Sequence, residues 1–212
     1  QPKKCPVCDS ETTRKGGEVA VYCSNESCPA KDRSRILYAA RAFEIDGLGD
    51  SIVAQLLDAG LIQSTPDLFA LKPEDLLELE GFAEISANKL VEQIQDKKKV
   101  SLERFLVALG IRHVGSQTAA DIADKFGSLE KILKASESDL APVPGIGSKV
   151  AQSVVEYLKN ETNQRLISQF KDNGVLVESV VKGARKPLSG KKFVFTGSME
   201  KTINETNYRR KK

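Results

Sequence analysis

Four short stretches of the chain share one pattern of hydrophobic and small residues. Each has a hydrophobic residue, any residue, Gly or one substitute for it, a second hydrophobic residue, and then Gly or Ala. The stretches occupy residues 45–49, 79–83, 111–115 and 143–147, so their last residues are spaced by 34, 32 and 32 positions. Self-similarity at a period of this size indicates a repeated structural unit.

Each stretch is followed by the pattern of an amphipathic helix. Apolar residues recur four and seven positions after its last residue, and these offsets lie on one face of an α-helix. The pairs are Val53 and Leu56, Ala87 and Leu90, Ala119 and Ile122, and Ala151 and Val154. Further helical patterns precede the later stretches, at Leu76 and Leu77 and over residues 105–109. Each unit is therefore predicted to be a helix, a tight turn and a second helix.

The turn itself suggests a chemistry. Glycine allows backbone conformations that other residues avoid and lets another molecule approach closely. The second glycine of each turn is expected at the start of the second helix, where unpaired N–H groups and the positive end of the helix dipole face outward. Such a helix start can bind a phosphate without a cationic side chain.

The first 28 residues contain every cysteine of the chain. Cys5 and Cys8 form a Cys-x2-Cys pair, and Cys23 and Cys28 form a Cys-x4-Cys pair 14 residues later. Two close pairs joined by a short arm can bring four thiolates to one tetrahedral Zn²⁺, which favours sulfur ligands. Four thiolates leave no position for water, so this zinc is predicted to be structural.

Two disulfides are the alternative for these cysteines, as in small secreted proteins. The sequence shows no secretion signal, which favours zinc. Between the pairs, Gly16 and Gly17 predict a hairpin turn, with residues 19–21 as the returning strand.

Charge is distributed unevenly over the 212 residues, although the net charge is only +3. Residues 1–41 carry 8 basic and 5 acidic side chains, residues 42–185 carry 16 and 22, and residues 186–212 carry 8 and 2. The acidic middle cannot bind nucleic acid through bulk positive charge, so any binding there needs local contacts. Two groups of residues could supply such contacts. Lys97, Lys98 and Lys99 suggest a solvated linker or a contact to a DNA backbone, and Ser148 with Lys149 can add to a phosphate site.

The repeated unit resembles the helix-hairpin-helix motif of DNA repair and ligation proteins. Four such units behind a four-Cys module resemble the C-terminal half of bacterial NAD-dependent DNA ligase. The residues that carry this resemblance are Cys-Pro-Val-Cys at 5–8, Cys-Pro-Ala at 28–30 and Leu-Gly-Ile-Arg-His-Val-Gly at 109–115. The fold that it implies is mainly α: a small zinc module, four tandem helix-hairpin-helix motifs and a truncated α/β tail like the start of a BRCT domain.

The resemblance implies that backbone groups at the turns bind DNA phosphates without sequence preference. The expected DNA-binding residues are Gly47, Gly49, Gly81, Ala83, His113, Gly115, Gly145, Gly147, Ser148 and Lys149. Two of them depart from the double-glycine pattern. Ala83 still has an N–H group and is expected to keep a phosphate contact. His113 replaces the first glycine of its turn, so that turn is expected to differ from the others, and His113 is expected to contact phosphate or pack rather than catalyse.

Two other repeat or glycine families fit less well. A period near 34 residues also occurs in tetratricopeptide arrays, but those lack the Gly-hydrophobic-Gly turn. A dinucleotide-binding fingerprint needs a third glycine after a strand, whereas Ile52 and Val150 stand at that position and the turns follow helices.

Three domains are expected: residues 1–34 as the zinc finger, 35–184 as the helix-hairpin-helix domain, and 185–212 as a linker and an incomplete BRCT domain. The tail predicts a strand over residues 192–198 and a helix from about Asn204. These residues are too few to form a core of their own, so poor packing is expected. The chain starts at Gln1, as a piece of a longer protein would.

The sequence thus predicts the duplex-binding portion of an enzyme that seals nicks in DNA replication and repair. In the family, NAD adenylates a lysine in a Lys-x-Asp-Gly motif, which these 212 residues lack, so the piece alone is expected to be inactive. Zn²⁺ is its expected cofactor, and NAD and Mg²⁺ are implied only for the catalytic half. The expected partners are nicked duplex DNA and the catalytic domains of the same chain. The protein is expected to be a monomer in the cytoplasm, associated with the nucleoid and not with a membrane. A free-standing DNA-binding or scaffold protein is the alternative.

Overall fold

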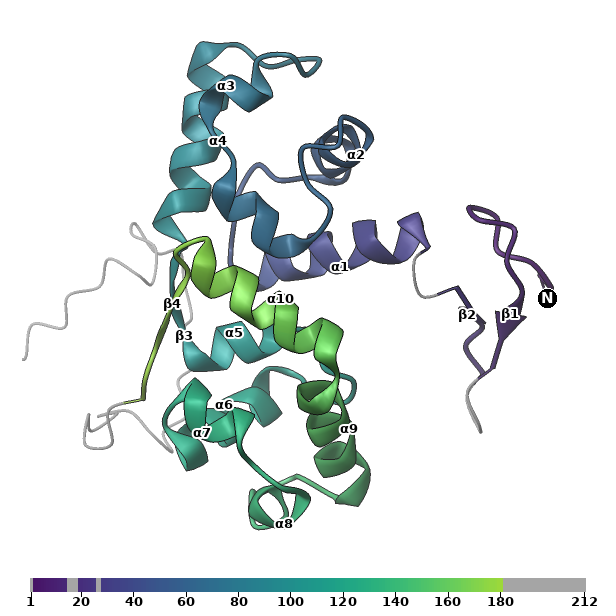
Figure 1. Cartoon of the computed structure of the whole chain (residues 1–212), viewed down its shortest axis with the longest axis vertical. Coiled ribbons are helices and arrows are strands. Elements are labelled where there is room, and N and C mark those ends of the chain that lie inside the picture. The colour runs from purple at the N-terminus through teal and green to yellow at the C-terminus, as the bar shows by residue number, and fades with distance from the viewer. Residues whose placement is uncertain (1, 15–18, 26–27, 181–212) are drawn as a thin grey trace, which may run out of the picture. The chain divides into compact units, whose positions relative to one another are not determined.

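The computed structural model describes residues 2–14, 19–25 and 28–180, and most of them are helical (Figure 1). They belong to one compact unit, Gln1–Lys182. The predicted turn at Gly16 and Gly17 lies outside the described residues. So do the predicted strand over residues 192–198, the helix from Asn204 and the BRCT-like tail as a whole.

The N-terminal segment contains a two-stranded antiparallel sheet. Strand β1 is Thr12–Thr13 and strand β2 is Tyr22–Cys23, with Thr12 opposite Cys23. The prediction of a strand over residues 19–21 is therefore wrong, because the strand begins at Tyr22. Val19 is 85% exposed, so nothing in this small module packs against it. Pairing with β1 instead brings Cys23 close to the other cysteines.

The rest of the described chain is built from two similar halves. Each half contains a helix before the first tight turn, a second helix after it, two short helical segments and a long helix after the second turn. The first half comprises α1 (Pro29–Ala42), α2 (Asp50–Asp58), the 3-10 helix η1 (Thr65–Ala70), α3 (Pro73–Leu76) and α4 (Glu84–Asp96). The second half comprises α5 (Leu102–Ala108), α6 (Ser116–Phe126), α7 (Leu129–Leu133), α8 (Glu137–Leu140) and α9 (Ser148–Lys159).

A last helix and a small parallel sheet complete this region. Helix α10 (Glu161–Asp172) leads into β4 (Leu176–Glu178), which pairs with β3 (Lys99–Ser101) between the two halves. Lys99 forms an ion pair with Glu178 at 3.0 Å. Of the three lysines, only Lys99 lies in the strand, and its side chain stays exposed, so the prediction of a solvated linker is wrong only for the backbone of Lys99. A strand over three residues has too short a pattern to be detected beside a lysine run.

Four phenylalanines form the centre of the core and join both halves to α10. They are Phe43 after α1, Phe69 in η1, Phe105 in α5 and Phe170 in α10. Each is at most 2% exposed. The ring centroids of Phe43 and Phe69 are 5.0 Å apart, and those of Phe105 and Phe170 are 5.3 Å apart. Edge-to-face pairs of this kind favour one packing arrangement over looser ones.

The helical periodicity read from the sequence is confirmed. The residues at the two predicted core offsets are all 5% exposed or less: Val53, Leu56, Ala87, Leu90, Ala119, Ile122, Ala151 and Val154. Leu76 is also buried, but Leu77, the C-cap of α3, is 44% exposed. Within the described part of the chain, no helix has the length and apolarity needed to cross a lipid bilayer.

Candidate zinc centre and nucleic-acid interface

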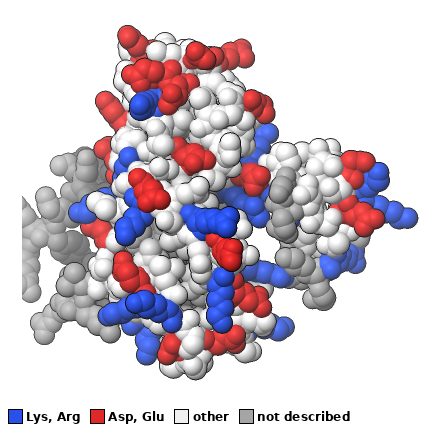
Figure 2. Space-filling view, in the orientation of Figure 1, with Lys and Arg blue, Asp and Glu red and all other residues white. Residues whose placement is uncertain are grey.

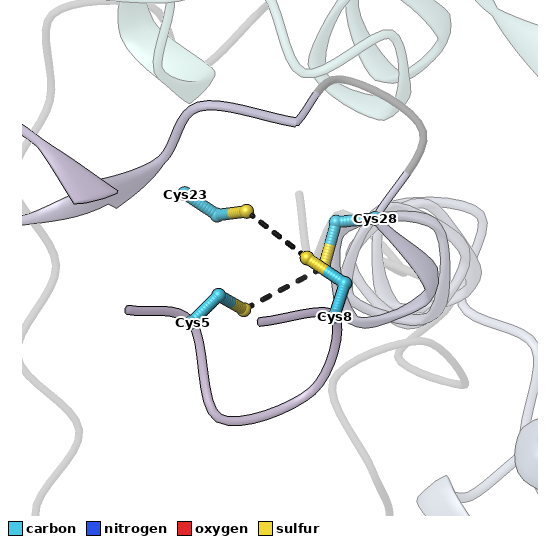
Figure 3. A group of neighbouring side chains, drawn as sticks. All are labelled: Cys5, Cys8, Cys23 and Cys28. Carbon is cyan, nitrogen blue, oxygen red and sulfur yellow. Dashed lines mark hydrogen bonds between the residues drawn. The ribbon is translucent and has the colours of Figure 1, made fainter. Parts of the chain in front are cut away.

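The four cysteines lie together. Their sulfur atoms are all within 4.8 Å of one another, with 3.4 Å between Cys8 and Cys23 and 3.8 Å between Cys5 and Cys28 (Figure 3). A tetrahedral zinc with bonds of about 2.3 Å to sulfur places its ligands about 3.8 Å apart. The four sulfurs therefore fit a Zn²⁺ ion.

The same distances do not fit disulfides. A disulfide bond is about 2.05 Å long, and all four cysteines are free thiols here. Each of these short sulfur–sulfur contacts joins a cysteine of the Cys-x2-Cys pair to one of the Cys-x4-Cys pair. A single centre shared by both pairs accounts for this arrangement.

Local structure prepares this cluster for a cation. A tight loop holds the first pair, with hydrogen bonds from Cys5 N–H to Ser10 C=O (2.8 Å) and from Asp9 N–H to Cys5 C=O (3.0 Å). Hydrogen bonding to Ser10 lowers the pKa of Cys8 to about 6, whereas burial raises the pKa of Cys23 to about 12. Burial also raises the pKa of Cys28, so without a cation it opposes ionisation of the second pair of cysteines. A divalent metal removes this penalty by compensating the thiolate charges.

The cysteine cluster is joined directly to the helical region. Cys28 is the N-cap of α1, and Pro29 is its first residue. The C=O of Cys28 accepts hydrogen bonds from the N–H groups of Lys31 and Asp32. Helix α1 continues past residue 34, where the sequence predicts a domain boundary, so one helix belongs to both predicted domains.

We call the four tight turns hairpins one to four, at residues 45–49, 79–83, 111–115 and 143–147. The third residue of every turn is left-handed, with φ of +81° at Gly47, +84° at Gly81, +65° at His113 and +76° at Gly145. The expectation that the turn at His113 differs is therefore wrong. Histidine adopts the same conformation, although a left-handed backbone costs a non-glycine residue about 1–2 kcal/mol.

The fifth residue of every turn is the N-cap of the following helix, as predicted. Gly49, Ala83, Gly115 and Gly147 all have extended backbone, which any residue adopts. A Cβ built on Gly49, Gly115 or Gly147 would meet nothing within 4 Å. Nothing in the described part of the chain therefore requires glycine there, and the space above these positions is open to a ligand.

Hairpins one, three and four leave backbone donors unused. Their N-caps make no side-chain capping bond, and the N–H groups of Gly49, Gly115 and Gly147 have no partner among the described residues. The first N–H groups of an α-helix have no acceptor within the helix either. These three turns therefore present outward-facing donors at the positive ends of helix dipoles.

Hairpin two differs in the use of its donors. The N–H of Ala83 donates to the hydroxyl of Ser86 at 2.9 Å, and that hydroxyl donates back to the C=O of Ala83 at 2.9 Å. The N–H that the sequence suggested for a phosphate is thus already bonded. The hydrophobic residues of this turn, Leu79 and Phe82, are also only half-buried, whereas their counterparts in the other turns are buried.

The residues just after each turn set the local charge. In hairpin four, Ser148 and Lys149 are exposed on the first turn of α9. In hairpin one, Asp50 occupies the first position of α2, but the Arg33 guanidinium pairs with its carboxylate, with Nε 2.8 Å from Oδ1. This pairing joins residues 17 positions apart, so the sequence offered no signal for it.

The surface around hairpin two is acidic. On the face shown in Figure 2, Asp and Glu side chains gather over the end of the view where Figure 1 places α3. The exposed acidic residues in or next to this turn include Glu78, Glu80 and Glu84. A phosphate would be repelled there, in contrast to hairpin four.

Three segments of the chain match family models. Residues 4–30 match the NAD-dependent DNA ligase C4 zinc finger domain, residues 41–96 match the SAM-like helix-hairpin-helix tandem, and residues 104–167 match the helix-hairpin-helix motif. The chain is related to the NAD-dependent DNA ligases. The two helix-hairpin-helix matches fall on the two structural halves, and the ligase zinc-finger match spans all four cysteines.

Individual DNA ligases show the same relationship over nearly the whole chain. The DNA ligase of Lysinibacillus sphaericus (strain C3-41) is 44% identical over 214 residues, covering 96% of this chain and 32% of that ligase. The DNA ligases of Bacillus mycoides (strain KBAB4) and Bacillus cereus (strain B4264) are 42% and 41% identical, each covering 94% of this chain and 31% of the ligase. The chain thus spans about a third of the length of these relatives.

Proposed function

We propose that this chain is the duplex-binding portion of an NAD-dependent DNA ligase that seals nicks in DNA replication and repair. The observation that supports this most directly is the set of outward-facing N–H groups at Gly49, Gly115 and Gly147, each under open space at a helix start. These donors suit phosphate oxygens, and the open space suits the approach of a DNA backbone.

The proposed binding of DNA phosphates follows from the chemistry of the turns. Gly47, His113 and Gly145 shape three turns through their left-handed backbone, and the amides that follow donate to phosphates. At hairpin four, the Ser148 hydroxyl and the Lys149 ammonium add a donor and a positive charge. Contacts to phosphates position the duplex but do not read its sequence. The protein is therefore proposed to bind duplex DNA of any sequence.

The zinc module is proposed to be structural. Cys5, Cys8, Cys23 and Cys28 would all bind Zn²⁺ through their sulfurs, which leaves no open coordination position for a substrate. Because Cys28 caps α1, metal binding would also hold the start of the first hairpin. The module is proposed to orient the hairpins against the catalytic part of the same protein.

The chemical steps of ligation are proposed to belong to the part of the relatives that this chain does not span. No Lys-x-Asp-Gly motif occurs in the 212 residues, so adenylation by NAD, with Mg²⁺, is assigned to that other part. The chain alone is expected to bind nicked DNA as a monomer without sealing it. In the cell, this binding would place the protein in the cytoplasm with the chromosome.

The test is fluorescence anisotropy with a labelled nicked duplex, repeated at several salt concentrations and with unrelated DNA sequences. Binding should be independent of sequence, and log K should fall with log[salt] with a slope of about −0.9 for each phosphate contacted. The absence of binding at low salt would contradict the proposal. Metal analysis of the natively purified protein should find one zinc per chain, and a folded sample without zinc would contradict the assignment of the cysteines.

A further inference from the structure

The four hairpins share one backbone design, but hairpin two satisfies its own helix start. Of the four N-cap amides, only that of Ala83 is hydrogen-bonded to another described residue, through the hydroxyl of Ser86. The residues at the position of Ser86 in the other hairpins are Ile52, Thr118 and Val150. Ile52 and Val150 have no hydroxyl, and no such bond from Thr118 is present. A phosphate at hairpin two would have to displace an existing hydrogen bond.

The charge at the helix start differs as well. Glu84 occupies the first position of α4, where a negative charge is stabilised by the helix dipole. It therefore already fills the role that a phosphate would play. Hairpin one also has an acidic residue at this position, but Arg33 neutralises Asp50. Glu84 has no ion-pair partner among the described residues.

The second residue of the helix also differs between hairpin two and the other three hairpins. Ile85 is 85% exposed at the second position of α4. The equivalent residues are Ser51, Gln117 and Lys149, all of which can donate to a phosphate. An exposed isoleucine offers no donor, and replacing it with a polar residue would cost little burial.

We propose that hairpin two does not hold a phosphate, so that the chain grips DNA through hairpins one, three and four. This inference rests on the proposed function, because it assigns the DNA contacts among the four turns. It follows from three separate features of hairpin two: a bonded N-cap amide, an uncompensated carboxylate at the helix start, and an exposed apolar side chain. The clamp is therefore asymmetric, with one contacting turn in the first half and two in the second.

The first experiment compares one substitution at two equivalent N-caps in the full chain. Ala83 and Gly147 both have extended backbone, so valine fits either position without backbone strain. Gly147→Val should weaken binding to a nicked duplex about tenfold, by blocking a charge-assisted hydrogen bond, and should make the salt slope shallower by roughly one unit. Ala83→Val should leave both quantities unchanged. Thermal unfolding of both variants checks that each remains folded.

The second experiment gives hairpin two the residues of hairpin four. The variant Ala83→Gly, Glu84→Ser, Ile85→Lys and Ser86→Val frees the amide, removes the carboxylate and adds a cation. Binding should become roughly three- to tenfold tighter, with a steeper salt slope, because a new phosphate contact forms. The matched control makes the reverse exchange, Gly147→Ala, Ser148→Glu, Lys149→Ile and Val150→Ser, and should weaken binding.

The outcomes separate the two proposals. If the unmodified chain fails to bind DNA at low salt, the proposed function fails, and the assignment of contacts fails with it. If the chain binds but Ala83→Val weakens binding as much as Gly147→Val, hairpin two contacts DNA and only the present inference is wrong. Unchanged binding by the hairpin-two exchange, beside weaker binding by the reverse exchange, would overturn the explanation by these three features, because removing them would then create no phosphate contact.

Discussion

Hairpins two and four occupy equivalent places in the two halves, 64 residues apart, and share one backbone design, but their side chains agree only at buried positions of the flanking helices. Leu76 and Leu140 are both 0% exposed before the turns, and Ala87 and Ala151 are both buried after them. On the solvent side, Glu84 and Ile85 in one half replace Ser148 and Lys149 in the other. The core constrains its residues because a cavity or a buried charge costs several kcal/mol. A turn that faces solvent has no such constraint, so its chemistry can differ while the fold stays the same.

Hairpin one shows how a turn with acidic character can still suit a phosphate. Asp50 would repel an anion by itself, but Arg33 reaches it from α1 and cancels its charge. The comparison of the halves therefore depends on long-range partners as well as on the residues of each turn. Three substitutions test this comparison, and their expected effects decrease from the shared core to the turns.

The largest effect is expected from the core that the two halves share. Phe43 contacts Phe69 of the first half, Phe105 of the second half and Phe170 of α10. Phe43→Ala should lower the free energy of unfolding by about 3–5 kcal/mol through the cavity that it leaves. Both halves should lose stability together in one urea transition, followed by circular dichroism.

Phe43→Leu is the matched control, since it keeps most of the apolar volume. It should lower the free energy of unfolding by no more than about 1.5 kcal/mol, less than Phe43→Ala. Two separate transitions in the alanine variant, with only one of them shifted, would show that the halves fold independently. In that case, the comparison would be between two small domains rather than two parts of one core.

A smaller effect is expected from removing the compensating charge in hairpin one. Arg33→Gln should leave Asp50 as an uncompensated carboxylate and so make hairpin one similar to hairpin two. The pair is exposed, so stability should change by less than about 1 kcal/mol. Binding to the nicked duplex should weaken about threefold, which corresponds to about 0.7 kcal/mol.

Adding Asp50→Ser to Arg33→Gln separates two explanations of that result. If Arg33 acts by neutralising Asp50, the double variant should regain most of the lost affinity. If the double variant stays as weak as Arg33→Gln, the guanidinium contacts DNA directly, and the equivalence of the two acidic turns is broken.

The smallest effect is expected at His113. Its left-handed backbone is strained, whereas glycine adopts this conformation freely but loses more entropy on folding. His113→Gly should therefore raise the free energy of unfolding slightly, by less than about 1 kcal/mol. Gly145→Ala, at the equivalent position of hairpin four, should lower it by about 1 kcal/mol. Thermal unfolding measures both changes.

A clear loss of stability in His113→Gly would indicate that the imidazole makes a stabilising contact that outweighs the strain. The two other left-handed non-glycine residues do have such partners. The side chain of Asp9 pairs with Lys4, and that of Glu44 pairs with Arg104. For His113, the structure shows no comparable bond among the described residues.

Much of the fold was predictable because its signals are local. The starts of α2, α4, α6 and α9 fall directly after the four predicted turns, and the residues at the predicted core offsets are buried. The close approach of the four cysteines was also predictable, since two pairs joined by a short arm suit one metal ion. The short strands were not, because two or three residues show no usable periodicity. The backbone of the turn at His113 was not predictable from its side chain, since His113 adopts the same left-handed conformation as the glycines of the other turns.

The sequence by itself determined the repeat, the helix faces and the metal-ligand spacing, because each depends on residues within about one unit of the chain. The tertiary structure decided which helix starts remain available to a ligand. The pairing of Arg33 with Asp50 and the meeting of four phenylalanines join distant segments. The bond from Ala83 to Ser86 is local, but it competes with solvent and with a ligand, and only the folded geometry shows that it forms. Availability of a backbone N–H is a property of everything packed around it, so it cannot be read from a turn motif alone.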